Sequence, residues 1–357
     1  MSNRLIALAL IVSTAAGLAL AAADAGWRDV LDTPAVKSPL AARSLLTGLA
    51  RAGERIVAVG QRGHVLYSDD RGGTWQQAQV PLSSDLVAVS FPTATAGWAV
   101  GHDGVVLRST DAGASWTRQL DGRSAGAAMV AYYEREAAAF AADPKRGAAL
   151  VEEARRFAAQ GAENPFLDVW FESETTGYAV GAFGLALRTT DGGAHWEPWL
   201  HRIENPKGLH LYSIRAVGRD VYIVGEQGLL LKLDRNAGQF RAIELPYKGT
   251  LFGVIGNDRV VLVHGLRGTL LRSADEGHTW AVVDTGLQVG LTGSAIDSDG
   301  RFIVVSQAGH VLVGTADGAH FKPAQIERPL PAAAVIAVAR DTVAIAGPRG
   351  VDVRTLR

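Results

Sequence analysis

Four aspartates are the first candidates for chemistry, because each lies in a glycine-rich turn that would expose a carboxylate for acid–base catalysis. Each occupies the same place in the string S/T-x-D-x-G-x-x-W, an Asp box. A carboxylate that recurs in this way accepts hydrogen bonds from the amides of its own turn, and the tryptophan packs back on the sheet. We therefore expect a structural role for Asp70, Asp111, Asp191 and Asp275 and for their partners Trp75, Trp116, Trp196 and Trp280.

The composition gives little support to other kinds of reactive site. The 357 residues include no cysteine, which excludes disulfides, thiol catalysis and zinc–thiolate sites. The nine histidines lack the spacing of zinc ligands, and no G-x-S-x-G elbow is present. The formal net charge of −1 gives no overall attraction to nucleic acid or to an acidic membrane. We expect no metal, no cofactor and no nucleic-acid partner.

A second recurring string, G-x-x-G, is a tight hairpin between two apolar runs. Its two middle residues form the hairpin tip, and three of the tips carry an arginine able to grip carboxylates. The alternative is that the tips are solvated turn residues without a partner. The tip residues that we expect to contact a partner are Arg62, His102, Asp103, Phe183, Glu226, Arg267 and Arg349.

These strings are positioned by a repeat of a strand, the G-x-x-G hairpin, a second strand and the Asp box. The hairpin strings recur about every 40 residues, with one gap of about 80. Four short strands in about 40 residues is the period of a β-propeller, whose closed ring protects its strand edges. The sequence predicts an all-β, seven-bladed propeller with the hairpin tips on one face and the Asp boxes on the opposite face.

The long gap contains an alanine-rich segment, residues 124–161, with apolar residues at helical spacing. Asp143-Pro144 is a typical helix start, and Gly161 is a typical helix stop. We predict a helical hairpin between blades two and three that overhangs the rim of the tip face. It either only packs against the propeller or is an element on which a partner docks. In the second case Tyr132 and Tyr133 are its candidate contact residues.

The two ends of the chain have separate expected roles. A basic residue, an apolar run and three small residues are typical of a signal peptide over residues 1–23. Export to the periplasm follows, or anchoring in the membrane if the segment is not cleaved. The seventh repeat ends at Arg357, before any fourth strand. We therefore expect a strand at about 27–34 to complete blade seven within a single propeller domain, residues 24–357.

The string V-G-x-x-G-x-[VL]-L-R-[ST]-x-D-x-G-x-[TS]-W resembles the photosystem II stability and assembly factor family and the wider neuraminidase-repeat (BNR, Asp-box) propellers. The resemblance covers about residues 27–354. It implies a non-enzymatic, exported scaffold that binds membrane-protein subunits during assembly. The helical hairpin and the incomplete set of arginine tips differ from photosynthetic members, so we expect a relative from a non-photosynthetic bacterium. The expected partner is a membrane-protein complex of the cell envelope, such as a transporter, bound by a monomer.

Two other functions stay open on the sequence alone. A sialidase-like glycoside hydrolase shares Asp boxes but needs an arginine triad, a tyrosine nucleophile with a glutamate partner, and an acid/base aspartate. Its R-I-P-type motif is absent near the first blade, and the nearest string, Arg202-Ile203-Glu204, lacks the proline. The other alternative is a lectin-like propeller that binds a glycan or small molecule on the tip face, with Phe183 and Tyr67 stacking on a sugar.

Overall fold

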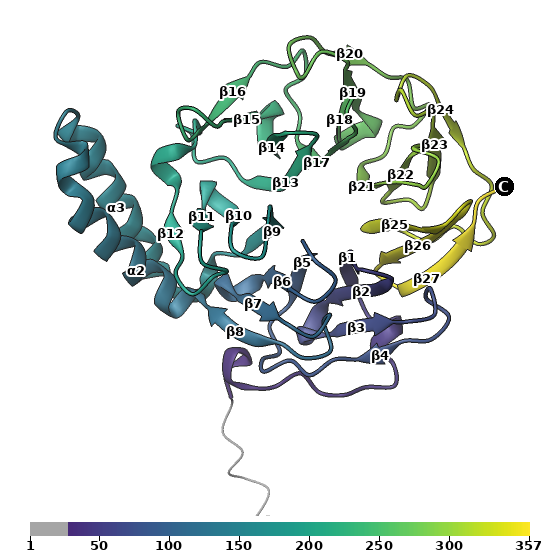
Figure 1. The fold of residues 1–357 in the computed structure, drawn as a ribbon, viewed down its shortest axis with the longest axis horizontal. Helices are drawn as coiled ribbons and strands as arrows, with labels where there is room; N and C mark the ends of the chain where they lie inside the picture. The colour runs from purple at the N-terminus through teal and green to yellow at the C-terminus, as the bar shows by residue number, and fades with distance from the viewer. Residues whose placement is uncertain (1–27) are drawn as a thin grey trace, which may run out of the picture.

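The computed structural model describes residues 28–357, in which seven antiparallel sheets surround a central axis as blades (Figure 1). Six blades have four strands each, and the seventh has three. The helical insertion lies between blades two and three. The predicted seven-bladed propeller with a helical hairpin is therefore confirmed.

The first four blades take up the chain from residue 46 to residue 243. Blade one consists of β1 (Leu46–Ala52), β2 (Arg55–Gly60), β3 (Val65–Ser68) and β4 (Gln76–Gln77). Blade two consists of β5 (Leu86–Ser90), β6 (Gly97–Gly101), β7 (Val106–Ser109) and β8 (Thr117–Leu120). Blade three consists of β9 (Phe166–Phe171), β10 (Gly177–Gly181), β11 (Ala186–Thr189) and β12 (Glu197–Pro198). Blade four consists of β13 (Leu211–Val217), β14 (Asp220–Gly225), β15 (Leu230–Asp234) and β16 (Gln239–Ile243).

The last three blades complete the ring. Blade five consists of β17 (Leu251–Gly256), β18 (Val261–Gly265), β19 (Leu270–Ser273) and β20 (Ala281–Val282). Blade six consists of β21 (Leu291–Ile296), β22 (Phe302–Ser306), β23 (Val311–Gly314) and β24 (Phe321–Pro323). Blade seven consists of β25 (Ala334–Ala339), β26 (Thr342–Gly347) and β27 (Gly350–Thr355).

The hydrophobic core is divided into layers between neighbouring blades. All five residues of β6, and likewise of β10, β18 and β22, are buried, because the second strand of a blade is covered on both faces. Such strands therefore read as continuous apolar runs. Between blades four and five, for example, Val224 and Leu230 pack against Val254 and Val263. This stack of apolar layers makes the ring a rigid support for its two faces.

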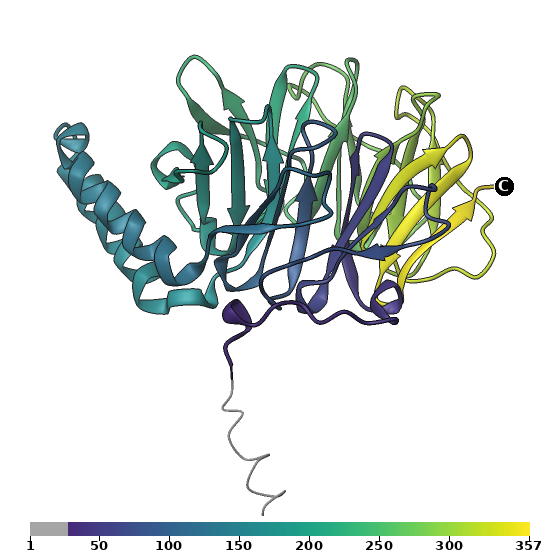
Figure 2. The same cartoon turned by 60° about the horizontal axis from the view of Figure 1, so that its bottom comes forward.

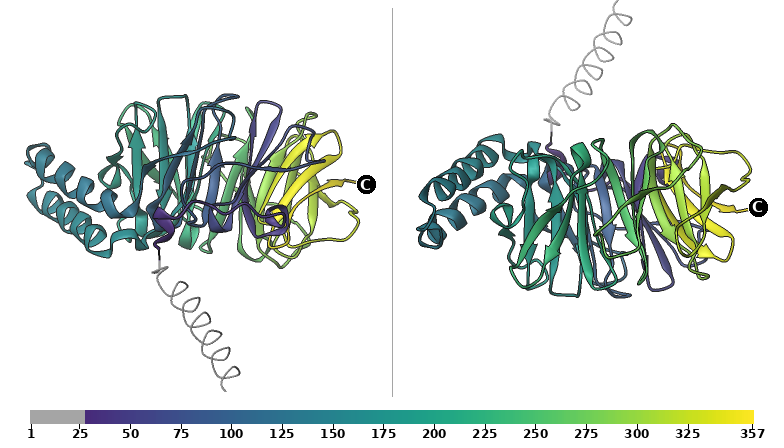
Figure 3. Two further views of the ribbon diagram at one scale, coloured as in Figure 1. Left: turned by 90° about the horizontal axis from the view of Figure 1, so that it is seen from below. Right: turned by 90° about the horizontal axis from the view of Figure 1, so that it is seen from above.

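The inserted segment forms α2 (Gly122–Arg135), the 3-10 turn η5 (Glu136–Phe140), α3 (Pro144–Gln160) and the 3-10 turn η6 (Gly161–Glu163). As predicted, Asp143 caps α3, accepting a hydrogen bond of 3.1 Å from the Arg146 amide, and Pro144 takes the first helical position. The base of the hairpin lies at the tip face, but its body slants outward along the flank of blade three (Figure 2; Figure 3). The predicted overhang of the tip face is therefore wrong. None of the helices in residues 28–357 is long and apolar enough to cross a membrane.

The prediction of a closing strand at about 27–34 is also wrong for residues 28–34, the part that the structure describes. Residues 28–34 contain the 3-10 helix η1 (Val30–Asp32) and no strand. The physical reason is Leu31, whose side chain is 2% exposed and packs in the core of blades one and two. The Ser83 amide donates to the Val30 carbonyl at 2.8 Å, which fixes this segment on the tip side of the ring. Trp27 and the predicted signal peptide lie outside the described residues.

The ring closes between blades seven and one by side-chain packing. Trp75 of blade one packs with Val353 of β27 and with the buried Ala344 and Val338. The Arg51 guanidinium of β1 donates to the carbonyl oxygens of Ala337 at 3.0 Å and Val338 at 3.2 Å. No strand in residues 28–357 is shared between the two ends of the chain.

Candidate functional site

The hairpin tips between the second and third strands form one face of the ring, which we call the tip face. In six blades the amide of the first tip residue donates to the carbonyl of the residue directly before that blade's first strand, at 2.8–3.2 Å. In five tips the second residue has φ near 55°, in the left-handed region. The glycine after Arg62 also has φ +67°, and a Cβ on it would overlap the Leu82 carbonyl oxygen, so only glycine fits. The tips are thus backbone-fixed mounts for their side chains.

The residues with this left-handed backbone are Arg62, Asp103, Phe183, Gln227 and Arg267.

The predicted contact residues at the tips differ in availability. Five have exposed side chains: Arg62, His102, Phe183, Arg267 and Arg349. The other two make hydrogen bonds within the fold. Asp103 accepts from the Ser84 hydroxyl, and Glu226 accepts from the His210 amide at 2.9 Å. These two carboxylates therefore hold neighbouring connections in place.

The three exposed tip arginines are spread around the face. Arg62 and Arg349 lie on the neighbouring blades one and seven, whereas Arg267 lies on blade five. None of them takes part in an ion pair within residues 28–357. Their guanidinium groups are therefore free to bind carboxylates of a partner at separate points of the face.

Tyr133 belongs to the packing of the hairpin, which corrects its predicted role as a contact residue. Its side chain is 1% exposed, and its hydroxyl lies 3.3 Å from Nδ1 of His201. Burial raises the pKa of Tyr133 and lowers the pKa of His201 to about 4. Tyr132 is half-buried beside them, with the Arg135 guanidinium 5.3 Å from its ring centre. An aromatic cluster thus seals α2 against blade three.

A cleft of about 520 Å³ lies between α3 and the tip of blade three. Phe183 stands at this cleft with 44% of its side chain exposed, and its amide donates to His210 Nδ1 at 2.7 Å. The Arg156 guanidinium of α3 lies 5.6 Å from the Phe183 ring centre, and Arg146 and Lys207 also line the cleft. These three cations are missing from the sequence-based set of contact residues. The sequence offered no signal for them, because residue spacing along α3 does not report that this helix lies beside Phe183.

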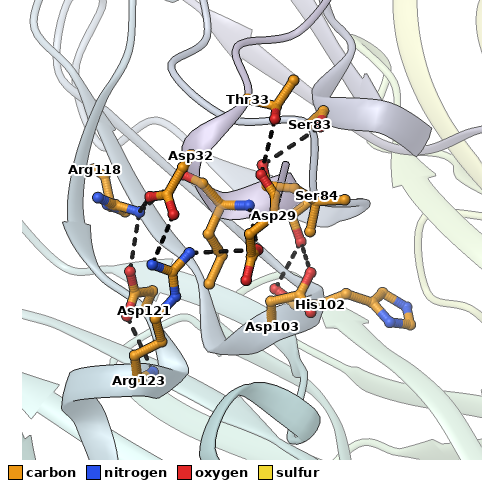
Figure 4. A network of polar contacts seen from close by, with 12 residues as sticks. Asp29, Asp32, Thr33, Ser83, Ser84, His102, Asp103, Arg118, Asp121 and Arg123 are labelled. Carbon is orange, nitrogen blue, oxygen red and sulfur yellow. Dashed lines mark hydrogen bonds and ion pairs between the residues drawn. The ribbon is translucent and has the colours of Figure 1, made fainter. Parts of the chain in front are cut away.

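A polar network clamps the N-terminal segment to the hairpin base (Figure 4). The Arg123 guanidinium contacts Asp32 at 2.9 Å and Asp29 at 3.3 Å. Arg118 contacts Asp121 at 3.0 Å and donates to the Leu31 carbonyl at 2.9 Å. The hydrogen bond from Arg123 holds the pKa of Asp32 below its usual range. The start of the described chain, blade two and α2 are therefore joined at one point of the tip face.

The Asp boxes lie on the opposite face and are saturated with hydrogen bonds. Oδ1 of Asp70 accepts from the Thr74 amide and the Ser68 hydroxyl, both at 2.8 Å, and Oδ2 accepts from the Thr74 hydroxyl at 2.7 Å. These donors, the Thr74 amide first, lower the pKa of Asp70 to about 2. A carboxylate that stays ionised at neutral pH and accepts three hydrogen bonds from its own turn is poorly suited to proton transfer.

The central channel, with a volume of about 300 Å³, is lined by the first strand of every blade. Its charged pair is Arg215 and Asp168, 2.5 Å apart. His264 is buried beside it and bonds to the Ser294 hydroxyl and the Leu291 carbonyl, both at 3.0 Å. Residues 28–357 contain no cluster of three or more His, Asp or Glu side chains able to hold a metal ion.

Seven blades, repeated Asp boxes and a rigid tip face define a propeller of the Asp-box class. The chain belongs to the family described as photosynthesis system II assembly factor YCF48, whose family model matches residues 45–144 and 149–325. A relative is the photosystem II assembly lipoprotein Ycf48 of Synechococcus sp. (strain CC9902), 28% identical over 152 residues, or 41% of this chain. That match spans 45% of the length of the relative.

Solved structures share the fold at low sequence identity. YCF48 bound to D1 peptide has a TM-score of 0.61 at 15% identity, covering 90% of this chain and 96% of that chain. YCF48 from Cyanidioschyzon merolae has a TM-score of 0.59 at 17% identity, covering 90% and 97%. The GH74 enzyme of Niastella koreensis has a TM-score of 0.58 at 12% identity, covering 87% and 52%. These likenesses show the propeller fold, which alone does not define an activity.

Proposed function

We propose that this protein is a non-enzymatic assembly factor that binds a segment of a membrane-protein subunit on its tip face. The observation that carries the proposal is a set of exposed, unpaired arginines and an exposed Phe183 on tips whose backbone is fixed. A tip backbone that is fixed before binding loses little conformational entropy when a partner docks. Family membership supports the same role, as does the solved relative with a bound D1 peptide.

The proposed function also includes a cellular compartment and a kind of binding partner. We infer that the protein acts as an exported monomer, in keeping with a relative that is named as a lipoprotein. The absence of cysteine means that this chain has no thiol for lipid attachment, so a cleaved or retained N-terminal segment takes that place. The expected partner is a membrane complex of the cell envelope, such as a transporter.

The test is crosslinking and pull-down from envelope membranes with Arg62→Glu combined with Arg267→Glu. Both positions are exposed, so folding stays intact, but the reversed charges repel partner carboxylates and capture falls by about tenfold or more. The matched control is Arg71→Glu with Arg259→Glu, which makes the same charge change at exposed sites on the Asp-box face. Equal capture by both double variants would reject the tip face as the binding surface. Turnover of a fluorogenic sialoside would reject the non-enzymatic role.

A further inference from the structure

Blade seven has a strand edge that is open along β27, whereas just beyond it the backbones of Arg357 and Gln325 bond to each other at 2.9 and 3.2 Å. Within residues 28–357, β27 pairs with β26 alone, whereas the third strand of every other blade also pairs with a fourth. Gly347 and Gly350 flank the two-residue turn between β26 and β27 and form a hydrogen-bonded pair. Because such pairs alternate along an antiparallel ladder, residues 350, 352 and 354 of β27 direct their backbone groups towards β26. The backbone groups of Val351, Val353 and Thr355 therefore point outward.

The outward groups of Val353 are occupied only by neighbouring side chains. Its amide donates to the carboxylate of Asp352 at 2.8 Å, and its carbonyl accepts from the Arg354 guanidinium at 3.3 Å. These two side chains also pair with each other at 2.5 Å. Such local contacts are easily exchanged for those of an added strand, because unpaired edge groups are a template for pairing with another chain.

A basic cleft of about 380 Å³ adjoins this edge. Its lining includes four arginines and one aspartate, a formal net charge of +3. The arginines come from three segments: the 3-10 helix η2 (Ala41–Arg43), the connection between blades six and seven, and β27 with its turn. Arg43, Arg328 and Arg349 are exposed and form no ion pair within the described part of the chain. The apolar part of the cleft lining includes Ile326, Leu330 and Ile345.

We propose that the edge of β27 and this cleft bind an acidic, extended peptide segment of a partner protein as the fourth strand of blade seven. The peptide runs antiparallel to β27, as the fourth strands of the other blades run against their third strands. Backbone hydrogen bonds supply affinity, and alternate acidic side chains reach the arginines, which supply specificity. The cleft shares Arg349 with the tip face, but Arg43 and Arg328 lie outside the hairpin tips, so changes at these two positions distinguish the two sites.

The test measures binding of a fluorescein-labelled octapeptide of alternating valine and glutamate to the full chain by anisotropy. Two control probes separate charge from strand pairing: the same peptide with lysine in place of glutamate, and the glutamate peptide with alternate amides N-methylated. We expect both controls to bind at least about tenfold more weakly, since one reverses the charge and the other removes the edge hydrogen bonds. Equal binding of either control, or no binding of the glutamate peptide, would overturn the proposal.

Variants of the protein locate the site. Arg43→Glu with Arg328→Glu should weaken binding of the glutamate peptide at least about tenfold, whereas Arg62→Glu with Arg267→Glu leaves it unchanged. The reverse pattern would assign the peptide to the tip face and overturn the inference. Binding only to a chain that begins at residue 28 would also overturn it, because the edge would then belong to the protein's own N-terminal segment.

Discussion

Gly126, in the second turn of α2, offers a test in which two physical effects have opposite signs. Glycine in a helix interior costs about 1 kcal/mol relative to alanine, so Gly126→Ala would stabilise an isolated helix by that amount. In this protein the residue is buried, and a Cβ on it would overlap the Ala158 Cα of α3 and lie 2.6 Å from the Ala158 nitrogen. Both atoms belong to the backbone, so no side-chain rotation relieves these contacts.

The size of the effect follows from the distance that α3 must move. Moving the Ala158 nitrogen from 2.6 Å to 3.4 Å, where ordinary van der Waals contact begins, requires a shift of about 0.8 Å, and the closer Cα requires slightly more. Overpacking of this kind costs about 1–3 kcal/mol, and a shift of that size also weakens the packing of Phe157 and Leu150. Because the lost packing adds to the cost, we take the upper part of that range, about 2–3 kcal/mol. After the helix gain of about 1 kcal/mol is subtracted, we expect Gly126→Ala to destabilise the hairpin by about 1–2 kcal/mol.

Hydrogen exchange followed by mass spectrometry over residues 122–160 measures this change locally. A loss of about 1–2 kcal/mol raises the exchange rate about 5- to 30-fold. Ala131→Gly, at an exposed site of the same helix, serves as calibration and should cost about 1 kcal/mol. If Gly126→Ala slows exchange while Ala131→Gly speeds it, helix propensity alone governs the hairpin, and the inferred close packing of α2 on α3 is refuted.

Three further predictions concern the hairpin seal and the tips. Tyr133→Phe removes the hydroxyl beside His201 and should cost about 0.5–1.5 kcal/mol in urea unfolding at pH 7; no change would show that this contact is not a hydrogen bond. Because burial lowers the pKa of His201 and of His264 to about 4, from an ordinary 6.5, the unfolded chain binds their protons first. Stability should therefore be full above about pH 6.5 and fall as the pH drops toward 4, and a flat profile by thermal melting would contradict this. Gly63→Ala should cost at least about 2 kcal/mol through both left-handed strain and overlap with the Leu82 carbonyl, whereas Gly238→Ala, at φ +60° in open space, should cost about 1 kcal/mol.

The repeated part of the fold could be predicted from the sequence because each blade repeats its own local rules. The buried second strand appears as an apolar run, the hairpin tip as G-x-x-G and the Asp box as its own string. All three recur about every 40 residues. The hairpin was predictable for the same reason, since Asp143, Pro144 and Gly161 are local signals of helix ends.

The closing strand was mispredicted because its outcome depends on contacts far along the chain. Residues near Trp27 imitate the strand after an Asp box, but Leu31 is buried in blades one and two. Asp32 pairs with Arg123, 91 residues away. Similarly, Arg156 reaches Phe183 only because α3 slants along blade three, and no spacing in the sequence reports that direction.

The contact between blades one and seven determines how the ring responds to mechanical load on the two ends of the chain. In a propeller closed by a shared strand, pulling the two chain ends apart shears a ladder of backbone hydrogen bonds that must break together. In this protein the described residues bridge the two blades through two apolar clusters, one with Trp75 and Val353 and one with Leu46 and Ala346, and through the hydrogen bonds of Arg51. Among the described residues, blades one and seven can therefore separate by parting side-chain contacts, without shearing a ladder of backbone hydrogen bonds.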